Sequence, residues 1–148
     1  MPKHILSGIK ALVTFKLKKK GLKNKDIAKY LKIDNTVVSH YLSGTFPKND
    51  ILEVAEVIKS LPPSCGAKFI HTITKDKDLS KILVKELYDV DIIWDEEKCI
   101  FCYQCAECDA IKIENGKISI DKDKCCLCAN CTFLCPTKAL RFRRDINE

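Results

Sequence analysis

Cysteine offers the clearest chemistry in this chain, because nine of its ten cysteines fall within residues 99–135. The second of two cysteine runs has the spacing Cys125-x2-Cys128-x2-Cys131-x3-Cys135 and is followed by proline. Thiolates this close together are suited to metal binding, and this spacing is typical of cysteines that bind iron–sulfur clusters. Three cysteines on a tight loop and one from farther away can converge on one cluster. The run therefore predicts an iron–sulfur site.

A first cysteine run begins 26 residues earlier, at position 99 rather than 125, and the residues around the two runs repeat. Its spacing is Cys99-x2-Cys102-x2-Cys105-x2-Cys108. An apolar strand and an acidic turn precede each run (IIWDEEKC and ISIDKDKC), and a short Ala-apolar segment follows each (AIKI and ALRF). Asn115-Gly116, between the copies, is typical of a hairpin turn. We therefore predict two copies of a unit made of a strand, a cysteine loop, a short helix and a strand.

On these runs and the repeat around them, residues 91–143 resemble a two-cluster ferredoxin domain of the bacterial type. In that family the fourth cysteine of each run binds the cluster of the other run. The resemblance therefore implies two 4Fe–4S clusters with exchanged fourth ligands. Cluster one would be bound by Cys99, Cys102, Cys105 and Cys135, and cluster two by Cys108, Cys125, Cys128 and Cys131.

The first run departs from the family pattern at Cys108. The family separates its third and fourth cysteines by three residues and then has a proline, whereas only two residues separate Cys105 from Cys108 and the proline is missing. Cluster two therefore depends on Cys108 reaching the same point from a shortened loop. One alternative is a full cluster one with a three-iron, labile or absent second cluster. Another is structural zinc in the cysteine runs.

Two cysteines lie outside the ligand pattern. Cys126 stands beside a predicted ligand and is either a small buried side chain or a replacement ligand when cluster two rearranges. Cys65, in the segment PPSCG, is isolated and is either structural or a redox-active thiol. The reactivity of such a thiol depends on its thiolate character.

Charge is divided unevenly along the 148 residues, whose formal net charge is +6. Residues 1–62 contain 12 Lys against 5 acidic residues, whereas residues 63–148 are nearly neutral. The basic front half is therefore expected to contact a polyanion. No apolar run approaches the ~18–20 residues that span a membrane, and no signal-peptide pattern is present. Together with the ligand spacing of the cysteines, this favours a reducing cytoplasm and no membrane partner.

Residues 5–60 have helical periodicity. Apolar residues recur at helical spacing over residues 5–17 and predict a first helix that ends in lysines. We predict two short helices next, joined by a three-residue turn around Ile33, with Asp34 capping the second. A fourth helix follows, and Pro62-Pro63 closes the domain.

The two short helices, with Ala28 at their crossing and the segment VVSHYLSG, resemble the helix-turn-helix of the lambda-repressor-like family. Lys32 stands where that family usually has Gly. The resemblance implies that the second helix enters the major groove of DNA. The groove-facing positions would be Asn35, Thr36, Val37, Ser39 and His40, and Lys23 and Lys25 would contact phosphate. The alternatives are a protein-binding helix with ordinary exposed polar residues, and a solvated charged surface.

Residues 63–90 connect the two halves. The segment KFIHTIT alternates with β-branched residues and predicts a strand. From Asp78 to Tyr88, leucines and isoleucines at positions 79, 82, 83 and 87 share one face and predict an amphipathic helix. Two partners fit that face: the C-terminal sheet, or the same helix of a second copy.

The sequence thus predicts an α+β fold. It comprises an all-α helix-turn-helix bundle (1–62), a connector (63–90) and a ferredoxin-like β-α-β repeat with pseudo-twofold symmetry (91–148). In this combination the chain resembles iron–sulfur transcription regulators of archaea and anaerobes. We expect a non-enzymatic homodimer that binds double-stranded DNA and whose clusters sense redox state, oxygen or iron. The alternative is an electron-transfer ferredoxin whose helical part docks onto a redox protein.

Overall fold

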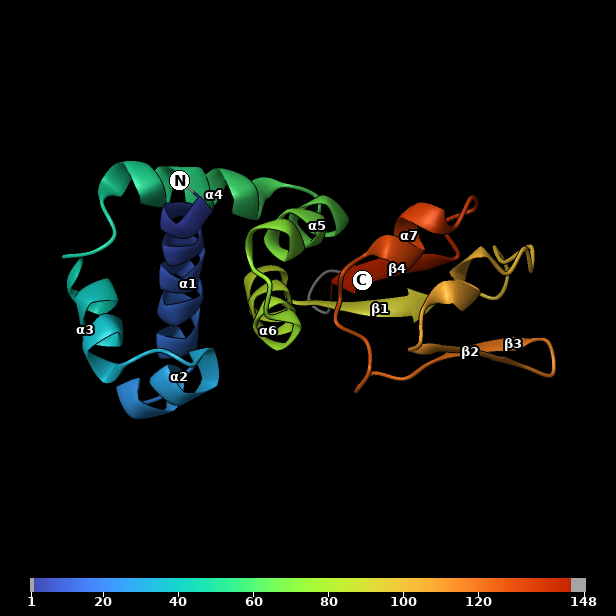
Figure 1. The fold of residues 1–148 in the computed structure, drawn as a ribbon, viewed down its shortest axis with the longest axis horizontal. Helices are drawn as coiled ribbons and strands as arrows, with labels where there is room; N and C mark the ends of the chain where they lie inside the picture. Colours follow the sequence, from blue (N-terminus) through green and yellow to red (C-terminus); the bar gives the residue numbers. More distant parts are fainter. Residues whose placement is uncertain (1, 145–148) are drawn as a thin grey trace.

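Six helices precede the first strand in the computed structural model, which describes residues 2–144. Figure 1 shows these helices toward one end of the molecule and the cysteine-rich strands and loops toward the other. The predicted α+β class is confirmed. The helices are α1 (Pro2–Lys19), α2 (Asn24–Leu31), α3 (Asn35–Ser43), α4 (Asn49–Ser60), α5 (Pro63–Ile73) and α6 (Lys77–Tyr88).

Helix α1 forms the centre of the helical part. Its apolar side chains at helical spacing, among them Ile9, Val13 and Leu17, are almost fully buried. Helices α2, α3 and α4 pack against it (Figure 1). The predicted periodicity over residues 5–60 therefore corresponds to four helices, with the apolar face of α1 buried among the other three.

Three residues join α2 to α3, as predicted. Lys32 adopts the left-handed conformation, with φ of 57°, at the position where Gly would adopt it without strain. Asp34 occupies the position before α3, but its side chain accepts no hydrogen bond from the helix. The predicted side-chain cap is therefore wrong, although the turn itself is present.

The segment predicted as a strand is part of helix α5. Pro62 lies between α4 and α5, and Pro63 is the first residue of α5, where its missing N–H costs nothing. Gly66, Ala67 and Ile70 form the buried face of α5 at helical spacing. The alternation in KFIHTIT was therefore misleading, since packing against neighbouring helices outweighs β propensity.

Helix α6 is the amphipathic helix predicted for the connector. Its side chains Leu79, Leu83, Val84 and Leu87 are buried. Helices α1 and α5 cover it, and it also contacts the first strand. The apolar face that was expected to meet the sheet or a second copy is thus largely covered within the chain.

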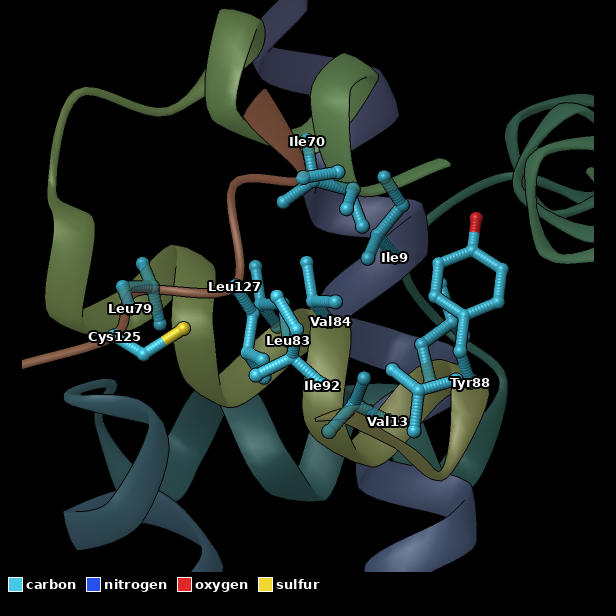
Figure 2. Packing of buried hydrophobic residues seen from close by; sticks show 14 of the residues in the cluster. Ile9, Val13, Ile70, Leu79, Leu83, Val84, Tyr88, Ile92, Cys125 and Leu127 are labelled. Carbon is cyan, nitrogen blue, oxygen red and sulfur yellow. The ribbon is translucent and has the colours of Figure 1, made fainter. Parts of the chain in front are cut away.

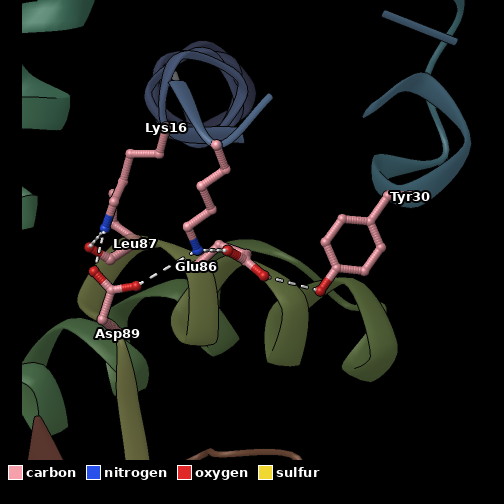
Figure 3. A network of polar contacts seen from close by, with 6 residues as sticks. Lys16, Tyr30, Glu86, Leu87 and Asp89 are labelled. Carbon is pink, nitrogen blue, oxygen red and sulfur yellow. Dashed lines mark hydrogen bonds and ion pairs between the residues drawn. The ribbon is translucent and has the colours of Figure 1, made fainter. Parts of the chain in front are cut away.

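Polar contacts join α6 to the first helix (Figure 3). Lys16 Nζ lies 2.7 Å from Asp89 Oδ2 and donates to the Leu87 carbonyl at 3.2 Å. Lys20 Nζ lies 3.0 Å from Glu86 Oε2, and Tyr30 donates to Glu86 Oε1 at 3.1 Å. These contacts fix the angle between α1 and α6, while the apolar contacts supply most of the stability.

The strands described in the cysteine-rich part form two antiparallel pairs. They are β1 (Val90–Trp94) with β4 (Leu140–Arg144), and β2 (Ile111–Glu114) with β3 (Lys117–Ile120). Asn115 and Gly116 have φ of 51° and 71° and join β2 to β3 as the predicted hairpin turn. A 3-10 helix, η1 (Gln104–Glu107), follows the first cysteine loop, and α7 (Asn130–Leu134) follows the second.

The two halves of this part repeat each other in hydrogen bonding as well as in sequence. The N–H of Asp95 donates to the Ala139 carbonyl at 2.7 Å, and the N–H of Asp121 donates to the Ala110 carbonyl at 2.7 Å. Each bond joins the start of one cysteine loop to the strand that follows the other loop. The loops are therefore held against each other.

One hydrophobic core runs through both parts of the described chain (Figure 2). It extends from Ile9 in α1 through Leu83 in α6 to Ile92 in β1. Leu127, between two cysteines of the second loop, is 5% exposed and belongs to the same core. None of the helices between residues 2 and 144 has the length and apolar character that crossing a bilayer requires.

Candidate metal centre

Each cysteine loop is curled by two residues in the left-handed conformation. In the first loop these are Phe101 and Tyr103, with φ of 55° and 61°, and in the second Leu127 and Ala129, with φ of 56° and 67°. In both loops they flank the second cysteine of the run. Where right-handed and left-handed residues alternate along a loop, successive backbone N–H groups point toward one centre. Such a loop forms a concave site for an anionic group. The loops therefore repeat in shape, with none of these four positions occupied by glycine.

An aspartate fixes the turn that leads into each loop. Asp95 accepts the N–H of Glu97 at 3.1 Å through Oδ1, and Asp121 accepts the N–H of Asp123 at 3.0 Å in the same way. Asp95 also pairs with Arg141, whose Nη1 lies 3.2 Å from Oδ2. The hydrogen bond with Arg141 is the largest of the effects that hold the pKa of Asp95 below its usual value.

The first thiol group surrounds a small cavity at the tip of the cysteine-rich part. Its four thiols line the cavity together with Trp94 and Leu140, and they are Cys99, Cys102, Cys105 and Cys135. Burial raises the pKa of Cys105, and repulsion from the charges of Cys102, Cys99 and Cys135 raises it further. The cavity holds ≈ 20 Å³. Cys102 and Ile100, which lie on this loop, are exposed to solvent.

The second thiol group lines a larger cavity of ≈ 610 Å³ that also reaches α6 and α7. Its predicted ligands are Cys108, Cys125, Cys128 and Cys131. Burial raises the pKa of Cys131 to about 12, and repulsion from Cys125, Cys108 and Cys128 adds to this effect. Thiols this close repel one another as thiolates, so a positively charged centre between them is needed to keep them ionised.

Cys108 lines the second cavity together with Cys125, Cys128 and Cys131. It directly follows η1, and its charge acts on both Cys125 and Cys131. Its N–H donates to the Cys105 carbonyl at 3.1 Å, and in the other half the N–H of Cys135 donates to the Cys131 carbonyl at 3.1 Å. The shortened first run thus ends in a 3-10 turn, whose hydrogen bond spans three residues, whereas the second run ends in an α-helical turn, whose bond spans four.

The pKa of Cys135 is lowered, whereas the pKa values of Cys105, Cys125 and Cys131 are raised. Burial acts to raise its pKa, but hydrogen bonds from the backbone at Leu140 and Ala139 and from the Thr137 hydroxyl outweigh burial and lower it. The N–H of Ala139 donates to Cys135 Sγ at 3.2 Å. Donors aimed at a sulfur favour its anionic form and stabilise it as a ligand.

The donor set fits two iron–sulfur clusters. Four cysteines line the first cavity and six line the second, and each cavity contains cysteines of both runs. Across the described residues, no group of three or more Cys, His, Asp or Glu side chains converges on a point suited to a single ion.

Cys126 lines the second cavity without belonging to the predicted ligand set. Burial raises its pKa to about 11, with repulsion from Cys128 next. His71 of α5 reaches the loop here, because its Nε2 lies 2.9 Å from the Cys126 carbonyl and donates to it. Sequence reasoning missed this contact, since α5 was predicted as a strand. Cys65 is exposed on α5.

The residues predicted to contact DNA lie on α2, on α3 and just before α2, at the end of the molecule away from the cysteine loops (Figure 1). Lys23, Lys25, Asn35, Thr36, Ser39 and His40 are exposed, and Val37 is half-buried. Exposure alone does not distinguish a surface that binds DNA from one that binds protein.

Comparison with known proteins relates the whole chain, including the helical part, to a curated protein. Over 145 residues, the chain is 53% identical to the ferredoxin-type protein FwdE of Methanocaldococcus jannaschii, and the match covers 98% of this chain and 99% of that protein. No protein-family model matches the chain. No solved structure matches it.

This relative overturns the prediction of a DNA-binding transcription regulator. Its identity to the chain spans the helical part as well, and its name describes a ferredoxin-type protein rather than a regulator. Two short helices joined by a three-residue turn are a packing arrangement that a small helical bundle can adopt without binding DNA, and a lysine-rich surface attracts acidic proteins as well as nucleic acid. The chain belongs to the family of ferredoxin-type proteins that includes FwdE.

Proposed function

We propose that this chain transfers electrons through two 4Fe–4S clusters, held by the two ligand sets predicted from the sequence. The observation that carries the proposal is that the cysteines of both runs gather around two neighbouring cavities, each lined by all four members of one predicted ligand set. A 4Fe–4S cluster supplies one-electron transfer over a wide range of potentials. In these sets Cys135 of the second run binds cluster one, and Cys108 of the first run binds cluster two. Each loop therefore contributes one ligand to the cluster of the other loop. As expected from the sequence, the proposal includes no catalytic step.

The two thiol groups are adjacent, which suits transfer from one site to the other. Cys105 belongs to the first group and Cys131 to the second, yet the charge of Cys105 contributes to the raised pKa of Cys131. Cys105 lines both cavities. The residues between the sites therefore form a short, buried connection.

The first site lies at the surface, where a redox partner can approach. Cys102 is exposed, and Ile100 and Tyr103 on either side of it are 61% and 51% exposed. Large exposed apolar side chains around a redox site suit a transient protein contact. The exposed, lysine-rich helical part is a second surface for an acidic redox protein. The predicted homodimer remains a prediction.

Iron and sulfide analysis of protein purified without oxygen tests the proposal. We expect about eight iron and eight sulfide per chain, and one-electron reduction of both sites visible by electron paramagnetic resonance. Stoichiometric zinc in a colourless, redox-silent protein would overturn it. About four iron per chain with a stable second site lacking iron would reduce it to a single-cluster protein.

Matched cysteine variants test the two ligand sets. Cys102→Ala removes a ligand of the first site only, and Cys108→Ala removes a ligand of the second site only. We expect each variant to lose the spectrum of one cluster and to keep that of the other. Cys65→Ala is the control, because this cysteine is exposed and lies in α5, outside both groups.

A further inference from the structure

Trp94 carries a buried polar atom that no other group satisfies. Its indole Nε1 is inaccessible to solvent and, in the described part of the chain, has no hydrogen-bond partner. Among the side chains of residues 4–142, no other buried nitrogen or oxygen lacks a hydrogen-bond partner. Leaving such a donor unpaired in the interior destabilises the folded protein. A buried indole N–H usually has a hydrogen-bond partner. The lack of a partner here points to an acceptor that the polypeptide itself does not supply.

The position of Trp94 indicates what that group is. Trp94 lines the first cavity together with the four thiols of the first group. Its ring is fixed by an edge-on contact with Phe101, with ring centroids 6.3 Å apart, and by the pairing of its backbone with Leu140. The indole is therefore held beside the place where the cysteines converge.

In the second half of the repeat, the position that corresponds to Trp94 carries no side-chain donor. Trp94 directly precedes Asp95, and in the repeat Ile120 directly precedes Asp121. Ile120 occupies the corresponding strand end and packs, partly buried, against the core. The two sites thus have matching loops and matching turns. At this position, however, the first site has an indole N–H and the second has an apolar side chain.

We propose that Trp94 Nε1–H donates a hydrogen bond to a sulfur of cluster one and makes its reduction potential more positive than it would otherwise be. The inference rests on the proposed function. Cluster sulfurs become more negative on reduction, so a donor stabilises the reduced form more than the oxidised form. Trp94 is therefore a positioning and tuning residue. It distinguishes cluster one from cluster two at this position of the repeat.

Potentiometric titration of Trp94→Phe, followed by electron paramagnetic resonance, tests this inference. We expect the ratio of reduced to oxidised cluster one at a fixed potential to fall about tenfold, which corresponds to 59 mV for a one-electron couple. The potential of cluster two should not change. Ile120→Val is the matched control, because it alters apolar packing at the corresponding position without removing a donor, and it should shift neither potential.

A second variant separates the lost donor from altered packing. Benzothienylalanine at position 94 keeps the shape of the indole and replaces N–H by sulfur. It should reproduce the shift and abolish one exchangeable-proton coupling to cluster one in electron–nuclear double resonance. Unchanged potential and couplings in this variant would overturn the inference while leaving the proposed function intact. Failure of the unaltered protein to bind two clusters would overturn the proposed function itself.

Discussion

At the scale of single residues, Gly66 decides how closely α5 and α6 pack. A Cβ at this position would overlap the Tyr88 hydroxyl, which donates to the Ile58 carbonyl at 2.6 Å in the buried core. We predict that Gly66→Ala lowers the free energy of unfolding by about 3 kcal/mol, because it overpacks the core and displaces a buried hydrogen bond. Urea unfolding followed by circular dichroism measures the loss. Thr72→Ala, on the exposed face of the same helix, should change stability by less than about 0.5 kcal/mol.

Asp95 makes stability depend on pH at the entrance to the first cysteine loop. Its pKa in the folded protein is lowered, first by the hydrogen bond with Arg141, so ionised Asp95 stabilises the fold above its unfolded pKa near 4. That contribution is lost as pH falls through the lowered pKa. Asp95→Asn should therefore be less stable than the unaltered protein at pH 7 and nearly equal to it at pH 2. An equal deficit at both pH values in urea unfolding would show that the charge is not responsible.

Residue types and spacing predicted that the cysteines of the two runs come together, as they do around the two cavities, but not the backbone around them. The two thiol groups follow from a ligand pattern that cluster chemistry imposes. The sequence does not predict the left-handed conformations at Phe101, Tyr103, Leu127 and Ala129, because none of these residues is glycine. The role of Trp94 was equally hidden, since its unpaired N–H appears only once the cavity beside it is known.

At the scale of elements, α5 shows where local pattern fails. Isoleucine and threonine alternate in its second half and favour a strand, whereas Pro63, Gly66, Ala67 and Ile70 fit a helix that packs closely on α6. Helix α6, with one uninterrupted apolar face, was predicted within one residue of its observed start. Tertiary packing decides short segments with mixed patterns, so strongly periodic elements are predicted more accurately than α5.

The contact between α5 and the second cysteine loop should protect cluster two. His71 Nε2 donates to the Cys126 carbonyl at 2.9 Å, and no matching histidine precedes the first loop. We predict that His71→Ala, which removes about 1 kcal/mol of hydrogen bonding, releases iron from cluster two several-fold faster in the presence of a chelator. Cluster one should be unaffected. Equal acceleration at both sites, or none compared with Thr72→Ala, would contradict this role of α5.

At the scale of the whole molecule, the helical part and the cysteine-rich part share one core, and Leu83 lies near its middle. Leu83 is fully buried in α6, between α1 and the second cysteine loop (Figure 2). We predict that Leu83→Ala destabilises the protein by about 2–5 kcal/mol, because it leaves a cavity. The midpoints of helix unfolding and of cluster release should move together, since both depend on the same packing. Circular dichroism and visible absorbance on one sample measure the two midpoints. Val57→Ala, at a 65% exposed position on α4, is the control. If the helices melt earlier while cluster release is unchanged, the predicted boundaries near residues 62 and 90 mark independent units instead.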